Sequence, residues 1–236
     1  MNVKQQGISG YWLKVIAVIS MLIDHTSAVI LEQIPGLENP AFLMRIIGRL
    51  AFPIYCFLLV EGFYHTRSRA KYAGRLFLFA LISEVPFDLA FSSKILEFNY
   101  QNVFFTLFIG LLTMIAYRAV EEKEEWNQAL KVILYILIVA AGMALAYFLK
   151  TDYAEKGVFC IMVLYIFRKK KMWQIIAGCA SFIWETPALF GFIPIAFYNG
   201  TRGWKMKYFF YIFYPAHLLI LYLLCYFMGI SGYSAV

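Results

Sequence analysis

Apolar residues form long runs along the chain, and most of the charged residues fall between those runs. Six runs are about long enough for a helix that crosses a bilayer, which needs about 20 residues. Three further runs, at 157–167, 172–184 and 188–198, fall below the ~17 residues of a full span, so we expect tilted or re-entrant segments there. The longer helices are predicted at 12–31, 41–64, 72–91, 101–119, 132–149 and 208–228.

The composition places the chain among membrane proteins. Its 236 residues are 62% hydrophobic and 15% charged, whereas soluble domains are about 45–50% apolar and about 25% charged. We therefore predict an all-α polytopic membrane protein of about nine transmembrane or partly re-entrant helices. Residues 1–236 are expected to form a single domain without a cleaved signal peptide.

Two further features of the sequence are interpreted as structural. The run at 132–149 has no polar side chain beyond two tyrosines, and it is expected to be a largely lipid-facing scaffold helix. The four cysteines lie inside apolar runs without metal-ligand spacing, so they are expected to pack, and neither a disulfide nor a metal site is predicted. The cysteines are Cys56, Cys160, Cys179 and Cys225.

The net charge of +7 indicates topology rather than nucleic-acid binding. Lys and Arg collect in the cytoplasmic loops of membrane proteins. With a cytoplasmic N-terminus, the alternation of helices leaves Lys94, Lys150 and Lys156 in external loops and places most other basic residues inside. We predict a multi-pass protein of a bacterial-type cytoplasmic membrane, with lipid around it and no nucleic-acid partner.

Candidate chemistry begins with Asp24 and His25, which lie side by side past the midpoint of the first apolar run. A charge at that depth costs at least about 2.5 kcal/mol on insertion scales, so it needs a partner or a function. Three other helices are predicted to bring polar residues to the same outer half of the membrane. These residues are Arg45, Arg49, Glu84, Asp88, Gln101 and Asn102.

Each polar feature also has a structural explanation. An Arg–acid pair between helices often fixes packing rather than chemistry, but His25 adds a titratable group where leucine would pack better. His217 is equally consistent with an interhelical hydrogen bond. The basic loop after the second helix has two interpretations. It binds the phosphates of a cytoplasmic cofactor, or its positive charge only fixes the orientation of the helices in the membrane. Its residues are Arg67, Arg69, Lys71 and Arg75.

Seven motifs follow one another in order over nearly the whole chain. They are Met21-Leu-Ile-Asp24-His25, Arg45-Ile-Ile-Gly48-Arg49, Val60-Glu61-Gly62-Phe63, Glu84-Val-Pro86-Phe-Asp88, Gln101-Asn102, Asn199-Gly200 and Phe213-Tyr214-Pro215-Ala-His217. Together they resemble the TraX family, whose namesake acetylates the N-terminus of F-pilin. This family is in turn similar to integral-membrane acyltransferases that O-acetylate envelope polysaccharides and that show a first-helix histidine and an Arg-x-x-x-Arg motif.

The resemblance implies an acyltransferase that uses acetyl-CoA or another acyl-CoA, with His25, Asp24, Arg45 and Arg49 at its catalytic centre. The acceptor is expected to be an envelope glycan, a peptide or a pilin-like protein. Our hypothesis is that His25, oriented by Asp24, acts as general base, while Arg45 or Arg49 stabilises the oxyanion or holds the donor. The expected substrate-binding or supporting residues are Glu61, Glu84, Asp88, Asn102, Tyr214 and His217.

The sequence is also consistent with two other functions. A transporter would use Asp24, His25 and the two arginines as a proton or anion relay, although the polar helices cluster in the first half of the chain without an inverted repeat. The other alternative is a membrane assembly factor without catalytic activity.

Overall fold

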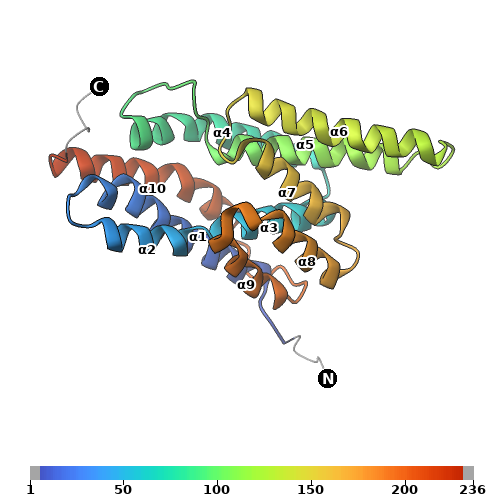
Figure 1. Ribbon diagram of the computed structural model, residues 1–236, viewed down its shortest axis with the longest axis horizontal. Helices are drawn as coiled ribbons and strands as arrows, with labels where there is room; N and C mark the ends of the chain where they lie inside the picture. The colour runs from blue at the N-terminus through green and yellow to red at the C-terminus, as the bar shows by residue number, and fades with distance from the viewer. Residues whose placement is uncertain (1–5, 231–236) are drawn as a thin grey trace.

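The computed structural model describes residues 6–230, and the regular structure in this range is helical (Figure 1). Two isolated β-bridges pair Ile8 with Tyr198 and Gln101 with Thr151. The predicted all-α class is confirmed. The helices are α1 (Gly10–Val29), η1 (Leu31–Gln33), α2 (Glu38–Gly48), α3 (Ala51–His65), α4 (Arg69–Ser92), α5 (Val103–Glu121), α6 (Gln128–Phe148), α7 (Ala154–Ile166), α8 (Lys171–Ser181), η2 (Ile183–Gly191), α9 (Phe192–Ala196) and α10 (Lys207–Phe227).

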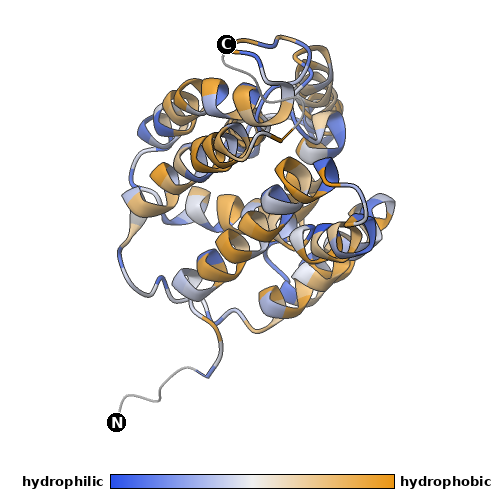
Figure 2. Cartoon of the chain, turned by 90° about the vertical axis from the view of Figure 1, so that its left-hand side faces the viewer, coloured by the Kyte–Doolittle hydropathy of each residue, from blue (hydrophilic) through white to orange (hydrophobic). Residues whose placement is uncertain are grey.

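Five stretches within the described residues are long and apolar enough to cross a membrane. Helix α4 has 24 residues but also carries a basic first turn, Glu84 and Asp88. Figure 2 shows that hydrophobic residues predominate along the helices and hydrophilic ones along many of the connections. The chain is therefore a helical membrane protein. The five stretches are Gly10–Gln33, Glu38–His65, Val103–Glu121, Gln128–Phe148 and Tyr208–Phe227.

The apolar run predicted as one helix at 41–64 is broken into α2 and α3 after Gly48. Pro53 lies in the first turn of α3 and has no N–H to donate to the carbonyl of Arg49, four residues earlier. Gly48 adds a weak helix former at the end of α2. The break therefore follows from the local sequence, and it separates Arg45 in α2 from Arg49 in the joint.

The last two short runs, expected at 172–184 and 188–198, form one hairpin built from α8, η2 and α9. The Lys171 ammonium donates a 2.8 Å hydrogen bond to the carbonyl of Tyr198, so the two ends of the hairpin lie together. Its turn contains Glu185, whose φ of −128° and ψ of 70° interrupt the helical backbone. We call this segment the α8–α9 hairpin.

The two ends of the bundle differ in charge. We call one the basic end, because it contains Arg67, Arg69, Arg118 and Arg168. Two ion pairs join helices there, Arg69 with Glu122 at 3.9 Å and Arg168 with Glu61 at 2.8 Å. The opposite, far end contains the Gln101–Thr151 bridge and the approach of Cys225 Sγ to the Val29 carbonyl at 3.4 Å.

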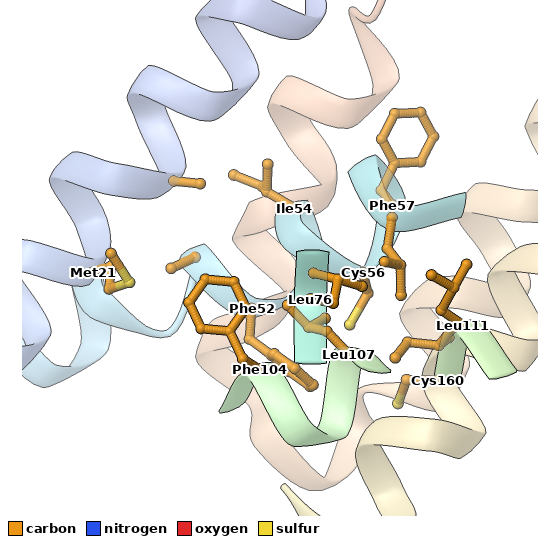
Figure 3. Close-up of a cluster of buried hydrophobic side chains, with 14 of the residues drawn as sticks. Met21, Phe52, Ile54, Cys56, Phe57, Leu76, Phe104, Leu107, Leu111 and Cys160 are labelled. Carbon is orange, nitrogen blue, oxygen red and sulfur yellow. The ribbon is translucent and has the colours of Figure 1, made fainter. Parts of the chain in front are cut away.

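Side chains from most of the helices meet in the core, and Figure 3 labels among them Met21 of α1, Phe52 of α3, Leu76 of α4, Leu107 of α5 and Cys160 of α7. Lipid tails are as apolar as these side chains, so helix association depends on close packing and polar contacts. Only 11% of the α6 window is buried, so most of the helix predicted to face lipid is left uncovered by the rest of the described chain.

Candidate functional site

Two histidines meet between α1 and α10. Nδ1 of His25 lies 2.7 Å from Nε2 of His217. The rings are stacked, with centroids 5.0 Å apart and 4° between their planes. His217 is 4% exposed. The structure therefore makes His217, which the sequence suggested only as a supporting residue, the direct partner of His25.

The contacts of His217 determine which ring nitrogens carry hydrogen. Its Nδ1 lies 2.8 Å from the carbonyl oxygen of Phe213. Because a carbonyl can only accept, Nδ1 of His217 is the donor, and the lone pair of the neutral ring is on Nε2. That Nε2 accepts from Nδ1–H of His25. His25 is left with an unprotonated Nε2, the atom that a general base needs.

Asp24 pairs with Arg45 instead of orienting His25. Its Oδ2 accepts a 2.6 Å hydrogen bond from Nη1 of Arg45, whose Nε lies 3.3 Å from Glu32. Neighbouring residues on a helix project about 100° apart, so Asp24 and His25 face different helices. The expected Asp24–His25 pair is replaced by an Asp24–Arg45 pair and a His25–His217 pair.

Gly48 is what allows α2 to approach Asp24 so closely. A Cβ atom at position 48 would overlap the Asp24 side chain. Oδ1 of Asp24 is buried, and it has no hydrogen-bond partner within the described part of the chain. Arg45 thus satisfies one carboxylate oxygen of Asp24 and leaves the other buried without a partner in the described part of the chain.

Arg49 makes a separate set of contacts, although it lies only four residues after Arg45. Its Nε is 3.3 Å from Oε1 of Glu185, and its Nη1 is 3.5 Å from the hydroxyl of Tyr153. Glu185 comes from the turn of the α8–α9 hairpin. Of the three acids that the sequence placed in the same layer as the arginines, Asp24 pairs with one of them, while Glu84 and Asp88 pair with neither within the described part of the chain.

Tyr100, Asp152 and Tyr153 form a polar and aromatic cluster beside Arg49. The hydroxyl of Tyr100 donates a 2.6 Å hydrogen bond to Oδ1 of Asp152. Burial raises the pKa of Asp152 to about 6, against the opposing effects of the Tyr100 hydrogen bond and the Arg49 charge. The Tyr153 ring stacks on Phe52 with centroids 3.6 Å apart. The loop between α6 and α7 is thereby attached to the core.

Glu84, Asp88 and Asn102 have structural partners. Asn102 caps α5, and its amide nitrogen donates to Glu84 and to the Ala80 carbonyl. Oδ2 of Asp88 accepts a 2.8 Å hydrogen bond from the backbone N–H of Glu97. Hydrogen bonds, first that from Lys94, lower the pKa of the Glu97 carboxyl to about 2. These contacts fasten the α4–α5 connection at the far end of the bundle.

A cavity of about 680 Å³ opens at the basic end and extends between α1, α3, α4, α5 and α10. Its inner part is lined by Met21, Leu76, Phe104, Leu107 and Tyr214. The Tyr214 ring stands edge-on to His25, with centroids 5.9 Å apart. The inner part of the cavity therefore reaches the aromatic wall of the histidine pair.

Two of the four basic residues in the loop after α3 line the cavity, and two do not. Arg67 and Arg75 line the cavity, where Lys14 and Arg202 join them. Arg69 lies over the Phe63 ring and pairs with Glu122, and Lys71 is exposed; neither lines the cavity. Lys14 and Arg202 thus take the places that the sequence suggested for Arg69 and Lys71.

Glu61 also lies at the cavity, but it pairs with another protein residue. Its Oε1 accepts a 2.8 Å hydrogen bond from Nε of Arg168. The Arg168 guanidinium lies over the Tyr64 ring, 4.0 Å from its centroid. Glu61 therefore contributes both to the cavity wall and to the connection between α3 and the end of α7.

The sequence of the chain matches a known protein family. The model described as "TraX protein" matches residues 9–225. The chain belongs to the TraX family. The matched range contains His25 and His217, Arg45 and Arg49, and the described lining of the basic-end cavity.

This TraX-family chain is similar to a probable fimbrial assembly protein, FimC of serogroup H1, from Dichelobacter nodosus. The two are 29% identical over 238 residues, which cover 90% of this chain and 94% of the relative. A shorter match, 29% identical over 98 residues, links 42% of this chain to 33% of "Uncharacterized protein RP591" from Rickettsia prowazekii (strain Madrid E). No solved structure matches the chain.

Sequence reasoning missed Glu32, Tyr153 and Glu185 in this TraX-family site. Glu185 carried a usable signal, because a lone acid in an apolar segment is costly unless it has a partner. Tyr153 carried no such signal in the sequence, because tyrosines are common at membrane interfaces. Its role follows from a loop fold that places its hydroxyl near Arg49.

Proposed function

We propose that this protein is an integral-membrane acyltransferase. It would move an acyl group, such as acetyl, from acyl-CoA to a hydroxyl or amine of an envelope or secreted acceptor. The observation that carries this proposal is the cavity whose basic mouth suits phosphates and whose inner wall, at Tyr214, contacts His25. Membership of the TraX family and similarity to a fimbrial assembly protein support the same assignment.

The topology that fits this function has the basic end in the cytoplasm and the far end outside a bacterial cytoplasmic membrane. Arginines and lysines concentrate at the basic end, as they do in cytoplasmic loops. Helices α1, α2–α3, α4, α5, α6, α7 and α10 would cross, and the α8–α9 hairpin would re-enter from the cytoplasm. This arrangement opens the large cavity to cytoplasmic acyl-CoA.

The donor would bind with its phosphates at the mouth and its acyl chain inside. Lys14, Arg67, Arg75 and Arg202 supply positive charge at the wide part of the cavity. Arginine and lysine side chains form short, strong hydrogen bonds to phosphate oxygens. The apolar inner wall suits the thioester end, which must lie close to His25.

The chemistry would be a direct acyl transfer. Nε2 of His25 takes the proton from the acceptor O–H or N–H as the acceptor atom bonds to the thioester carbonyl carbon. The carbon–sulfur bond then breaks, and the CoA thiolate receives a proton. His217 holds the base through Nδ1 and stabilises the imidazolium by accepting its hydrogen bond, a role that an aspartate fills in serine hydrolases.

The two arginines would act on the negative charge that develops on the carbonyl oxygen. Arg45 is paired with Asp24, the residue before His25 in α1, and Arg49 lies four residues after Arg45. Fixed cations in a site without water stabilise an oxyanion far more than they would in solution. Asp24 and Glu185 would keep the guanidinium groups in place between turnovers.

The proposal is tested by release of free CoA from acetyl-CoA by the purified protein in lipid nanodiscs. We expect His25→Ala to reduce the rate at least about 100-fold, the usual contribution of a general base. Leu22→Ala is the matched control, because Leu22 lies one turn earlier in α1 and is 37% exposed. A folded His25→Ala variant with the native rate would refute the assignment.

Binding supplies a second test that needs no acceptor. An acyl-CoA enzyme should be stabilised against heat by acetyl-CoA, since a ligand that binds the folded state raises its stability. Inorganic pyrophosphate at the same concentration should have a smaller effect. Indifference to acetyl-CoA would favour a relay or an assembly factor.

A further inference from the structure

The basic-end cavity ends close to the histidine pair. Its innermost lining residue on α1 is Met21, four positions before His25. On α10 it is Tyr214, three positions before His217. At the helical rise, each of these residues lies about 5 Å along its helix from the histidine that follows it. A carbonyl group bound at the inner end of the cavity would therefore lie beside the histidines.

The two arginines of the site stand outside this cavity. Neither Arg45 nor Arg49 contributes to its lining. Arg45 is paired with Asp24 and Glu32, and Arg49 is paired with Glu185. Their charges are balanced by carboxylates, and they would act on a bound carbonyl through the cavity wall. A direct hydrogen bond to the carbonyl oxygen must come from a residue that lines the cavity.

Tyr214 lines the cavity and also contacts both histidines. Its ring stands edge-on to His25, with centroids 5.9 Å apart and 72° between the planes. It stands edge-on to His217 as well, at 5.7 Å and 69°. Phe104 of α5 packs against the same ring at 5.1 Å. With 3% of its surface exposed, the phenol is held in position by these three rings.

Two other tyrosines of the lining, Tyr72 and Tyr211, lie with the cations of the phosphate end. The Arg75 guanidinium lies over the Tyr72 ring, 5.6 Å from its centroid. The Tyr72 hydroxyl faces Gly62 of α3, where an added Cβ atom would come within 2.8 Å of it. The Tyr211 hydroxyl lies beside the guanidinium of Arg75. These contacts leave Tyr214 as the tyrosine that faces the chemistry.

The hydroxyl of Tyr214 lies at the N-terminus of α5. The backbone N–H of Val103, the first residue of that helix, is directed at the hydroxyl oxygen. The first N–H groups of a helix have no partner within it, and they carry partial positive charge. A phenol oxygen that accepts from such a group becomes a stronger donor through its own O–H. Negative charge on a nearby ligand is favoured by the same helix end.

The O–H of Tyr214 has no acceptor within the part of the chain that the structure describes. Phenylalanine at this position would make the same ring contacts. A buried hydroxyl that donates to nothing is destabilising, so packing alone does not explain it. A ligand with a hydrogen-bond acceptor at the inner end of the cavity does.

We propose that Tyr214 is a catalytic residue of the transfer and that its O–H donates a hydrogen bond to the carbonyl oxygen of the bound thioester. This rests on the proposed acyltransferase function and adds a residue to its site. Tyr214 keeps its proton throughout, because the proton of the acceptor goes to His25. The arginines then add a longer-range field to this direct contact.

The electrons balance without a further reactant. As the acceptor atom bonds to the carbonyl carbon, the π-electron pair of the C=O bond moves onto the oxygen. The Tyr214 hydrogen bond strengthens as this charge develops, which lowers the barrier. When the carbon–sulfur bond breaks, the pair re-forms the C=O bond, and CoA leaves as the thiolate that is then protonated.

The direct test is infrared spectroscopy of acetyl-CoA labelled with ¹³C at the carbonyl, bound to full-length protein in nanodiscs. The His25→Ala variant is used because it should bind the donor without consuming it. We expect the bound C=O stretch to lie at a lower wavenumber than in solution, as a hydrogen bond weakens the C=O bond. His25→Ala/Tyr214→Phe should lose most of this shift.

Steady-state release of CoA by otherwise native protein supplies the kinetic test. Tyr214→Phe should lower kcat about 100-fold, the usual effect of removing one oxyanion donor, with little change in the KM for acetyl-CoA. Tyr222→Phe is the matched control, because Tyr222 also belongs to α10, is 8% exposed and lies outside the cavity lining. It should keep the native kcat and KM.

The outcomes separate this inference from the function on which it rests. Acetyl-CoA that fails to bind the native protein contradicts the acyltransferase itself. CoA release that requires His25 but proceeds at the native rate in Tyr214→Phe overturns the role of Tyr214 and leaves the acyltransferase standing. A lowered kcat with an unchanged carbonyl band also overturns it, since Tyr214 would then only orient His25.

Discussion

His25 and His217 are separated by 192 positions, yet a nitrogen of one ring lies 2.7 Å from a nitrogen of the other. The Phe213 carbonyl fixes the hydrogen on the far side of His217, so the two rings act as one unit with a single free basic nitrogen. This arrangement gives the site a neutral orienting group where an Asp–His pair was expected.

His217 should therefore contribute to kcat rather than to donor binding. We expect His217→Ala to lower kcat about 100-fold with little change in the KM for acetyl-CoA, because His25 loses its orientation. His217→Gln should recover part of the loss, since its amide oxygen can accept from Nδ1–H of His25. The measurement is steady-state CoA release by both variants. Equal activity of the two would point to a packing role.

The approach of α2 to α1 should depend on the glycine at position 48. Gly48→Ala would place a methyl group against Asp24, and we expect it to destabilise the protein by about 1–3 kcal/mol. Gly74→Ala is the matched control in α4, because nothing lies within 4 Å of the added atom. That variant should be neutral or slightly more stable. Unfolding of both variants in the same detergent measures the difference, and equal stabilities would contradict the close contact.

Donor affinity should follow the residues that line the basic-end cavity. Arg67→Gln and Arg75→Gln should each raise the KM for acetyl-CoA about tenfold, with a weaker effect at high salt. Arg69→Gln should leave this KM unchanged, because Arg69 pairs with Glu122 outside the cavity lining. Kinetics at two salt concentrations provide the test. A larger effect at Arg69 than at Arg75 would show that the phosphates bind elsewhere.

Asp152 should make stability depend on pH. Its pKa of about 6 in the folded protein lies above the ordinary value of 3.8. The neutral carboxyl thus favours folding, and this contribution is complete below pH ~4 and lost as the pH rises through about 6. Asp152→Asn should keep an acceptor for Tyr100 and gain stability relative to the native protein, by roughly 2 kcal/mol at pH 7.5.

The corresponding measurement is the unfolding midpoint of both proteins between pH 4 and pH 7.5. We expect the two curves to converge at low pH and to separate as the pH rises. A constant difference across this range would mean that Asp152 has an ordinary pKa in the folded protein.

Much of this fold is readable from the sequence because apolar runs must satisfy their backbone groups as helices. The positions of Asp24, Arg45 and His25 stood out for the same reason, since charges and imidazoles in such runs are costly. The break before α3 was also encoded locally, in Gly48 and Pro53. These features depend on neighbours within a few residues.

The pairing of side chains could not be read in this way. Asp24 and His25 are adjacent in sequence, yet their partners come from α2 and α10 because their side chains leave the helix in different directions. Glu185 reaches Arg49 only because the last short runs fold back as a hairpin. Such contacts depend on helix rotation and on long-range packing, which apolar patterning leaves open.

The most direct test of the account is a structure of the protein with a non-hydrolysable acetyl-CoA analogue. We expect phosphates beside Arg67 and Arg75 and an acyl carbonyl within reach of His25, close enough for an acceptor atom held at Nε2 to attack at about 3–3.5 Å. An analogue bound outside the basic-end cavity, or one whose acyl group points away from His25, would contradict it.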